Sequence, residues 1–504
     1  MAAVGEAVGT GSGAVSRAVS RKGWWRLQSL GSWVVGVSLI GSLPGTAALT
    51  QEPPTAEEGL AGEGVRYFEP EDEDEVVGRA GSGGPELSFG FEGRAHFRES
   101  DFNRFPVNFP FTPDMLPPGV QQGAMETVNE GSHLEISVLT LRFNARWSES
   151  LEAHAKIDFI DLHDRNPTSE DDEFDVDELW VRFGRETEPA LEAERFGAYL
   201  KIGKFPKFER QDDRHLESYG LVSTAFNRME DVGVELGADL GSHVYLKAQA
   251  TQGNPVFLRD PNALAGDNGI AELAQANPDP ELKSGITIPY DADVEDVDVD
   301  GDLELGAGLG LRFSNLDGSR GVDVLVWGYQ RDLAETVDFK GTFYGGDLDL
   351  LRGPGNAFSF PITSDRKEEV GANLWLYLGG FSLFAQYVDQ DLAGLERTGM
   401  EAEAAWRIDL PLKWAVGGKQ LFPWIAPAVR FSRLDPDFSA PPQTPSPSFA
   451  WEWEKIDAGI RLAILDGIDL TVEYAANDLT LASGAKRDND ELLTTLRWRV
   501  GKAR

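Results

Sequence analysis

The chain has 504 residues, a formal net charge of −38 and no cysteine. The absence of cysteine excludes disulfides, thiolate zinc sites and cysteine nucleophiles. The acidic balance argues against a nucleic-acid partner or an anionic surface. After residue 50 no apolar run reaches the length of about 18 residues that a membrane-spanning helix needs.

The first 48 residues have the pattern of a secretory signal peptide. A basic stretch precedes a short apolar core at 30–43, and small residues follow at 46–48. We therefore expect the mature chain to start near Leu49; a signal-anchor helix is the alternative, for which the core is short. Residues 49–85 carry an acidic run and a Gly-rich stretch, which predict a disordered acidic periplasmic segment.

From residue 86 onward the sequence alternates between apolar and polar side chains. In 87–97 the odd-numbered positions are apolar or small, whereas Glu92, Arg94 and His96 stand on the other face. A strand that crosses a bilayer at a tilt needs about 9–11 residues, longer than the average soluble strand. The pattern therefore predicts strands with one face toward lipid and one toward water, as in an outer-membrane β-barrel.

The alternation recurs about 16 times along the chain. The expected strands lie near 86–97, 139–147, 153–159, 179–183, 198–205, 232–240, 244–250, 303–313, 322–326, 370–378, 381–387, 400–408, 425–431, 456–464, 468–474 and 492–500. With the first strand rising outward, every long connection falls on the extracellular side. The short turns near 148–150, 241–242, 379–380 and 466–467 fall on the periplasmic side. We therefore predict an all-β transmembrane antiparallel barrel over 86–500.

A barrel of this size leaves an aqueous channel, which the polar face of each strand would line. The inward positions mix both signs of charge, as hydrophilic solutes require. We expect the basic pore lining to consist of Arg94, Arg142, Arg146, Lys156, Arg312, Arg430 and Arg461.

One stretch, 199–235, resembles the phosphate-selective porin O and P family. It reads Tyr-Leu-Lys-Ile-Gly-Lys-Phe-Pro-Lys-Phe-Glu-Arg at 199–210 and continues to an Asn-Arg element at 227–228. The resemblance implies a trimeric general or anion-preferring porin whose loop after the fifth strand folds into the lumen. The solutes it implies are small hydrophilic molecules or ions such as phosphate.

The resemblance places the pore constriction on that loop and the strand before it. The expected constriction residues are Lys201, Lys204, Lys207, Glu209, Arg210, Asp212, Asp213, Arg214 and Arg228. The loop is sign-balanced, in contrast to the dense Lys and Arg of the family. The chain also lacks the C-terminal aromatic residue usual for barrel assembly.

Other chemistry is poorly supported by the residues. The acidic stretch 296–301 resembles half of a calcium loop, but position 12 is Ala307 and not the bidentate Glu of an EF-hand. The six histidines are scattered, and His154 shares no convincing strand face with Ser150, so we expect no enzyme and no cofactor. We also expect no resident metal, with a loose cation site among the acids of that stretch as the alternative. A barrel sheath or a secretion barrel, for an electron-carrying or polymer partner, is the alternative to an outer-membrane porin.

Overall fold

The structure, a computed structural model, describes part of the chain. The described residues are 76–79, 84–100, 104–107, 123–126, 131–161, 175–185, 197–211, 214–226, 230–253, 288–291, 303–315, 319–332, 337–340, 363–364, 366–439, 450–488 and 490–500. The expected signal peptide lies outside them, as does most of the 49–85 segment. Val76–Arg79, near the end of that segment, forms the short strand β1, which pairs with β2.

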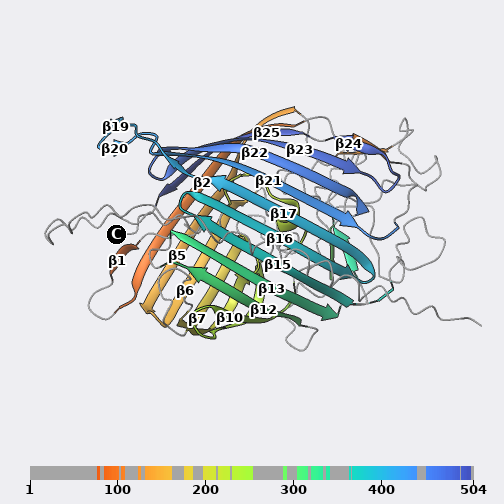
Figure 1. Cartoon of the computed structure of the whole chain (residues 1–504), viewed down its shortest axis with the longest axis horizontal. Coiled ribbons are helices and arrows are strands. Elements are labelled where there is room, and N and C mark those ends of the chain that lie inside the picture. Colours follow the sequence, from red (N-terminus) through yellow and green to blue (C-terminus); the bar gives the residue numbers. More distant parts are fainter. Residues whose placement is uncertain are drawn as a thin grey trace, which may run out of the picture. The chain divides into compact units, whose positions relative to one another are not determined.

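Sixteen long strands close into one antiparallel barrel, because the last of them pairs with the first. In chain order they are β2 (Glu86–Ser100), β5 (Gly131–Ser148), β6 (Leu151–Asp161), β7 (Asp175–Arg185), β8 (Ala198–Pro206), β9 (Glu230–Asp239), β10 (Val244–Thr251), β12 (Glu304–Ser314), β13 (Arg320–Asp332), β15 (Arg366–Leu378), β16 (Phe381–Leu392), β17 (Leu395–Trp406), β21 (Trp424–Pro436), β22 (Glu452–Leu465), β23 (Ile468–Thr480) and β25 (Glu491–Val500). All sixteen expected strands are present, and the predicted fold class is confirmed. In Figure 1 the orange to yellow strands of the N-terminal half pass behind the green to blue strands of the C-terminal half.

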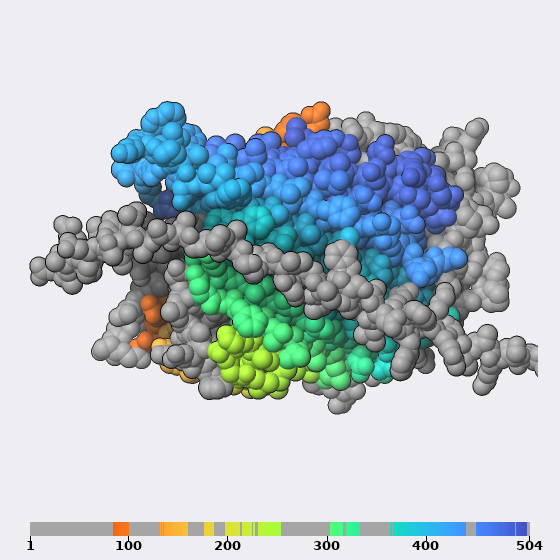
Figure 2. Space-filling view, viewed as in Figure 1, coloured from red at the N-terminus to blue at the C-terminus, as the bar shows by residue number. Residues whose placement is uncertain are grey.

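The remaining elements are short. They are β3 (Arg104–Val107), β4 (Gly123–Glu126), β11 (Ile288–Asp291), β14 (Val337–Lys340), β18 (Ile408–Asp409), β19 (Ala415–Val416), β20 (Lys419–Gln420), β24 (Lys486–Asp488) and the helix α2 (Leu221–Ala225). The β19–β20 hairpin stands off one end of the barrel in Figure 1 and Figure 2. Within the described residues, no helix is both long and apolar enough to cross a membrane.

The two faces of the barrel wall follow the alternation of the sequence. Large apolar side chains are exposed on the outer face, with Leu309 51% and Ile460 48% exposed. Exposed aromatic residues stand near the strand ends that carry the short turns, as in the interfacial girdles of membrane barrels: Trp147, Phe183, Phe313 and Trp406. Figure 2 shows the outward side chains of one part of the wall, coloured from green to blue.

Glycines on the inner wall make room for aromatic rings. A Cβ on Gly306 would overlap the ring of Tyr329, and one on Gly310 would overlap the ring of Tyr245. Each ring belongs to the neighbouring strand and lies along the wall over its glycine. The aromatic side chains are thereby buried against the sheet, and glycine is required because any side chain would push the rings into the lumen.

One connection differs from the expectation. The segment between Tyr387 and Met400 was expected to be an extracellular loop, but β16 and β17 continue to a two-residue turn at Ala393 and Gly394. Both turn residues have positive φ, 55° and 95°, as two-residue hairpin turns with the right-handed strand twist require. The outer ends of these strands carry Asp and Glu on their outward face. The alternation of apolar and polar residues that predicts a strand is therefore missing there, above the level of the lipid.

The assignment of the outer face to lipid can be tested with Lys substitutions at two different depths in the bilayer. We expect Leu309→Lys, in the middle of β12, to destabilise the barrel in lipid vesicles by about 2–4 kcal/mol, because Lys is then held at the bilayer midplane. Leu240→Lys, beside the periplasmic turn after β9, should cost about 0–1 kcal/mol, because its ammonium reaches the interface. Equilibrium urea unfolding in vesicles measures both. Equal losses for the two variants would contradict the assignment.

Candidate functional site

The loop at 207–229 crosses the lumen of the barrel. It leaves β8 and returns to β9, and its described residues are 207–211 and 214–226. Counting strands in either direction, β21 is the eighth from β8 and thus lies opposite it in a barrel of sixteen. Arg430 of β21 donates a hydrogen bond to the Ser218 carbonyl oxygen at 2.8 Å, so the loop reaches the far wall.

The first anchor of the loop is Lys207. Its ammonium lies 3.2 Å from Glu304 Oε1 and 3.7 Å from Glu369 Oε1, and 4.2 Å from the ring centre of Tyr329. Burial alone would lower the pKa of Lys207. The two carboxylates outweigh the burial and raise this pKa above its usual value, so Lys207 remains charged.

Two residues further on, Glu209 is completely buried. The Tyr329 hydroxyl donates a 2.6 Å hydrogen bond to its carboxylate, and the side-chain amides of Asn373 and Gln386 donate to its backbone carbonyl. Burial raises the pKa of Glu209 to about 7, although Lys207 and the tyrosine hydrogen bond act to lower it. The Glu209 side chain therefore titrates near neutral pH.

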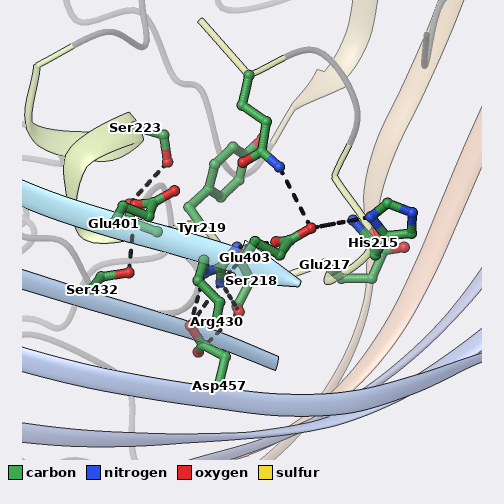
Figure 3. Close-up of polar contacts among 12 residues, drawn as sticks. His215, Glu217, Ser218, Tyr219, Ser223, Glu401, Glu403, Arg430, Ser432 and Asp457 are labelled. Atoms are coloured by element: carbon green, nitrogen blue, oxygen red, sulfur yellow. Dashed lines mark hydrogen bonds and ion pairs between the residues drawn. The ribbon is translucent and has the colours of Figure 1, made fainter. Parts of the chain in front are cut away.

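The middle of the loop lies against β16 and β17. His215 donates its backbone N–H to Glu403 Oε1 at 2.8 Å, and its Nδ1 lies 3.3 Å from the same oxygen. The other ring nitrogen, Nε2, lies 3.5 Å from the Ser382 hydroxyl. Figure 3 shows the histidine ring and the Glu403 carboxylate facing each other.

Beyond His215 the wall provides partners for the loop backbone. Glu473 accepts the N–H of Glu217 at 2.6 Å and of Ser218 at 2.9 Å. Lys455 donates to the Tyr219 carbonyl at 2.6 Å. Glu401 accepts the N–H of Val222 at 3.0 Å, in the first turn of α2. Charged wall residues thus replace the ladder partners that this segment lacks.

The carboxylate of Glu217 joins two wall cations. It lies 3.2 Å from Arg94 on β2 and 2.9 Å from Arg461 on β22. Burial alone would raise the pKa of Glu217, but the surrounding arginines hold it well below its usual value. The loop therefore contributes a permanent negative charge at this point.

The end of the loop packs through apolar contacts. The apolar side chains of α2, together with Phe226, are buried in one cluster with aromatic and aliphatic residues on the inner wall of β13, β16 and β21–β23. Trp451 and Trp453 are each 1% exposed in this cluster. A helix of five residues has little stability of its own, so this packing holds it in place.

The residues predicted for the constriction have the following positions. Lys201 lies 3.4 Å from Glu235, and Lys204 donates to the Val176 carbonyl at 2.7 Å. Arg210 forms an ion pair with Glu230. The Arg214 guanidinium stacks 3.7 Å above the ring centre of Tyr219. Asp212, Asp213 and Arg228 lie outside the described residues.

The residues predicted to line the pore all lie at inward positions, but each forms an ion pair with at least one carboxylate. Arg94 and Arg142 share Glu92, at 2.6 and 3.2 Å. Arg430 lies 2.9 Å from Asp457 and 3.2 Å from Glu403. The other four pair as Arg146 with Glu152, Lys156 with Asp177, Arg312 with Asp239, and Arg461 with Glu217. The expected basic lining is therefore largely neutralised; only Arg146, with a side chain 57% exposed, presents an open face.

Sequence reasoning missed the wall residues that hold the loop. They are Glu304, Tyr329, Glu369, Asn373, Gln386, Lys455 and Glu473. Their inward positions follow from the strand alternation, so they could have been recognised as lumen residues. Their contact with the loop could not, because it depends on barrel closure and on the register of distant strands.

Asp177, Glu178 and Glu230 bring carboxylate oxygens within 4.8 Å of one another. Lys156 binds Asp177 and Arg210 binds Glu230, so two cations already neutralise the group. This arrangement is that of an ion-pair network in the wall.

The closed barrel, its apolar outer band and its polar lumen are those of an outer-membrane protein. The chain is an outer-membrane β-barrel. No protein-family model matches it, and no curated protein matches its sequence.

Several solved structures of outer-membrane proteins align with most of the chain. The channel DcaP of Acinetobacter baumannii aligns with a TM-score of 0.44 at 9% identity, over 84% of this chain and 100% of that one. OprB of Pseudomonas putida aligns with a TM-score of 0.44 at 10% identity, over 83% and 94%. The anion-selective porin of Comamonas acidovorans has a TM-score of 0.38 at 8% identity, over 82% and 100%.

The raised pKa of Glu209 predicts a loop anchor that weakens with rising pH. The ordinary pKa is 4.5 and that in the folded loop is about 7, so the anchored loop holds a proton that the released loop gives up. The contribution to anchoring is complete below the ordinary pKa and is lost as the pH rises through 7. Hydrogen exchange of 207–211, corrected for intrinsic rates, should show more opening at higher pH, and Glu209→Gln should remove the trend. An unchanged trend in that variant would assign it to another group.

The role of Glu473 can be tested in the same way. Glu473→Ala removes the acceptor of two loop amides, and a hydrogen bond to a charged group contributes about 1.5–3 kcal/mol. We expect exchange at residues 217 and 218 to accelerate by roughly tenfold or more. Glu454→Gln, an exposed outward position on β22, is the matched control and should leave this exchange unchanged. Equal protection in both variants would show that the loop is held by other contacts.

Proposed function

We propose that the protein is a porin, a passive diffusion channel for small hydrophilic solutes and ions, narrowed by the loop at 207–229. The observation that carries this proposal is the bonding of the loop backbone, from Glu209 to Val222, to side chains of the barrel wall on β15, β17, β21 and β23. A segment held in this way divides the lumen at all times. It also opposes the alternative of a sheath or secretion barrel, since a macromolecule would have to displace it.

We further propose that ion preference is weak. A charge in a narrow constriction acts more strongly on a passing ion than the same charge in a wide vestibule, because water is partly excluded from the constriction. Here the loop cations Lys207 and Arg210 are matched by Glu304, Glu369 and Glu230. Phosphate is the solute that the family resemblance implies; the charge matching argues for passage of phosphate among other small solutes and against strong selection for it.

The proposal includes assembly as a homotrimer, which the family resemblance implies. Cross-linking of the protein in native outer membranes, followed by electrophoresis, distinguishes trimers from monomers.

The channel and its constriction are tested together in planar bilayers. Wild type should give stable ohmic conductance with a small reversal potential in a salt gradient. Arg210→Glu combined with Arg214→Glu should shift the reversal potential toward cation preference, because two basic groups at the narrow point become acidic. Arg433→Glu is the matched control, since Arg433 stands on the outer face of β21 beside Asp435.

A wild type without conductance would contradict the channel. A double variant with unchanged conductance and reversal potential would contradict the position of the constriction and leave the channel intact.

A further inference from the structure

The contacts around His215 have the form of an activated nucleophile. Ser382 Oγ lies 3.5 Å from His215 Nε2, and His215 Nδ1 lies 3.3 Å from Glu403 Oε1. A hydroxyl, an imidazole and a carboxylate thus follow one another. One ring nitrogen contacts the hydroxyl and the other contacts the carboxylate. Such an arrangement is recognised by geometry and roles and not by order in the sequence, and its first contact is often long before substrate binds.

The carboxylate is fixed so that it orients the histidine. Glu403 is buried, and its Oε2 pairs with Arg430 at 3.2 Å. Its Oε1 faces His215 and also accepts a 3.5 Å hydrogen bond from the side-chain amide of Gln211. The same Oε1 accepts the His215 backbone N–H, so the residue is held at two points. A proton on Nδ1 directed at Glu403 leaves the lone pair of Nε2 for the serine hydroxyl.

The serine faces the lumen and not the lipid. Its neighbours on β16, Phe381 and Leu383, pair with outward residues, whereas Ser382 lies across from buried Tyr377 of β15. Ser382 is half-buried, and the His215 side chain is 18% exposed. Both groups can therefore meet a small molecule in the channel.

We propose that Ser382, His215 and Glu403 form a hydrolytic site for small carboxylic esters in the lumen. Nε2 takes the hydroxyl proton as Ser382 Oγ bonds to the ester carbonyl carbon. The tetrahedral intermediate expels the alcohol, which receives the proton from His215. Water then attacks the acyl-serine, giving up a proton to His215, and the carboxylic acid leaves as Oγ regains its proton. This activity is separate from solute diffusion and goes beyond the proposed channel.

The surroundings define the class of ester. Phe384 stands two residues from Ser382 on the same face, and its ring lies 5.3 Å from that of Trp375, which favours a short apolar or aromatic acyl group.

The test uses the full-length protein in detergent micelles, with a fluorophosphonate probe and p-nitrophenyl acetate. Peptide mass spectrometry of the labelled wild type should place the phosphonyl group on Ser382. Ser382→Ala should abolish labelling and lower ester hydrolysis by at least about 100-fold, and His215→Gln should slow both to a similar degree, since a general base contributes about 10²–10⁴-fold.

Ser432→Ala is the matched control, because Ser432 is an inner-wall serine whose hydroxyl donates to Glu401. It should keep the label and the hydrolysis of wild type. Heat-modifiable migration in electrophoresis shows that each variant is folded. Folded wild type without a label on Ser382, or hydrolysis that survives Ser382→Ala, would overturn the assignment.

Discussion

A chain segment that crosses the lumen of a barrel leaves the hydrogen-bond ladder of the sheet, and its backbone must find other partners. In this protein the partners are charged side chains of the opposite wall. Glu473 and Glu401 accept loop N–H groups, while Arg430 and Lys455 donate to loop carbonyls. Because unpaired buried backbone groups are costly, the wall needs polar residues at these positions whatever passes through the channel.

The same demand explains why so many charges are buried inside the barrel. A charge that holds the loop must itself be compensated, since an unpaired buried charge costs several kcal/mol. Arg430 lies between Asp457 and Glu403, and Glu217 lies between Arg94 and Arg461. The basic residues of the lumen are thus part of a structural network, and a count of Arg and Lys at inward positions overstates the field that a passing ion meets.

The limits of sequence prediction follow from the same physics. Alternation predicts the wall because lipid selects one face of every strand: Leu309 and Ile460 point outward as expected. It fails where strands rise above the lipid, as at Ala393, because polar residues then occupy both faces. The path of the loop was expected from family resemblance alone. Its contacts join residues far apart in sequence, such as Ser218 and Glu473, so only ring closure and register bring them together.

The two ends of the loop are held by different means, and the difference determines where it meets water. Lys207 is locked by carboxylates at one end, and α2 is packed into an apolar cluster at the other. Both anchors are buried, so neither offers groups to a solute. Between them His215 keeps part of its ring exposed while Glu403 holds the other side. Because a site needs fixed groups that a small molecule can reach, the middle of the loop is where the described part of the lumen is best suited to act on what passes through.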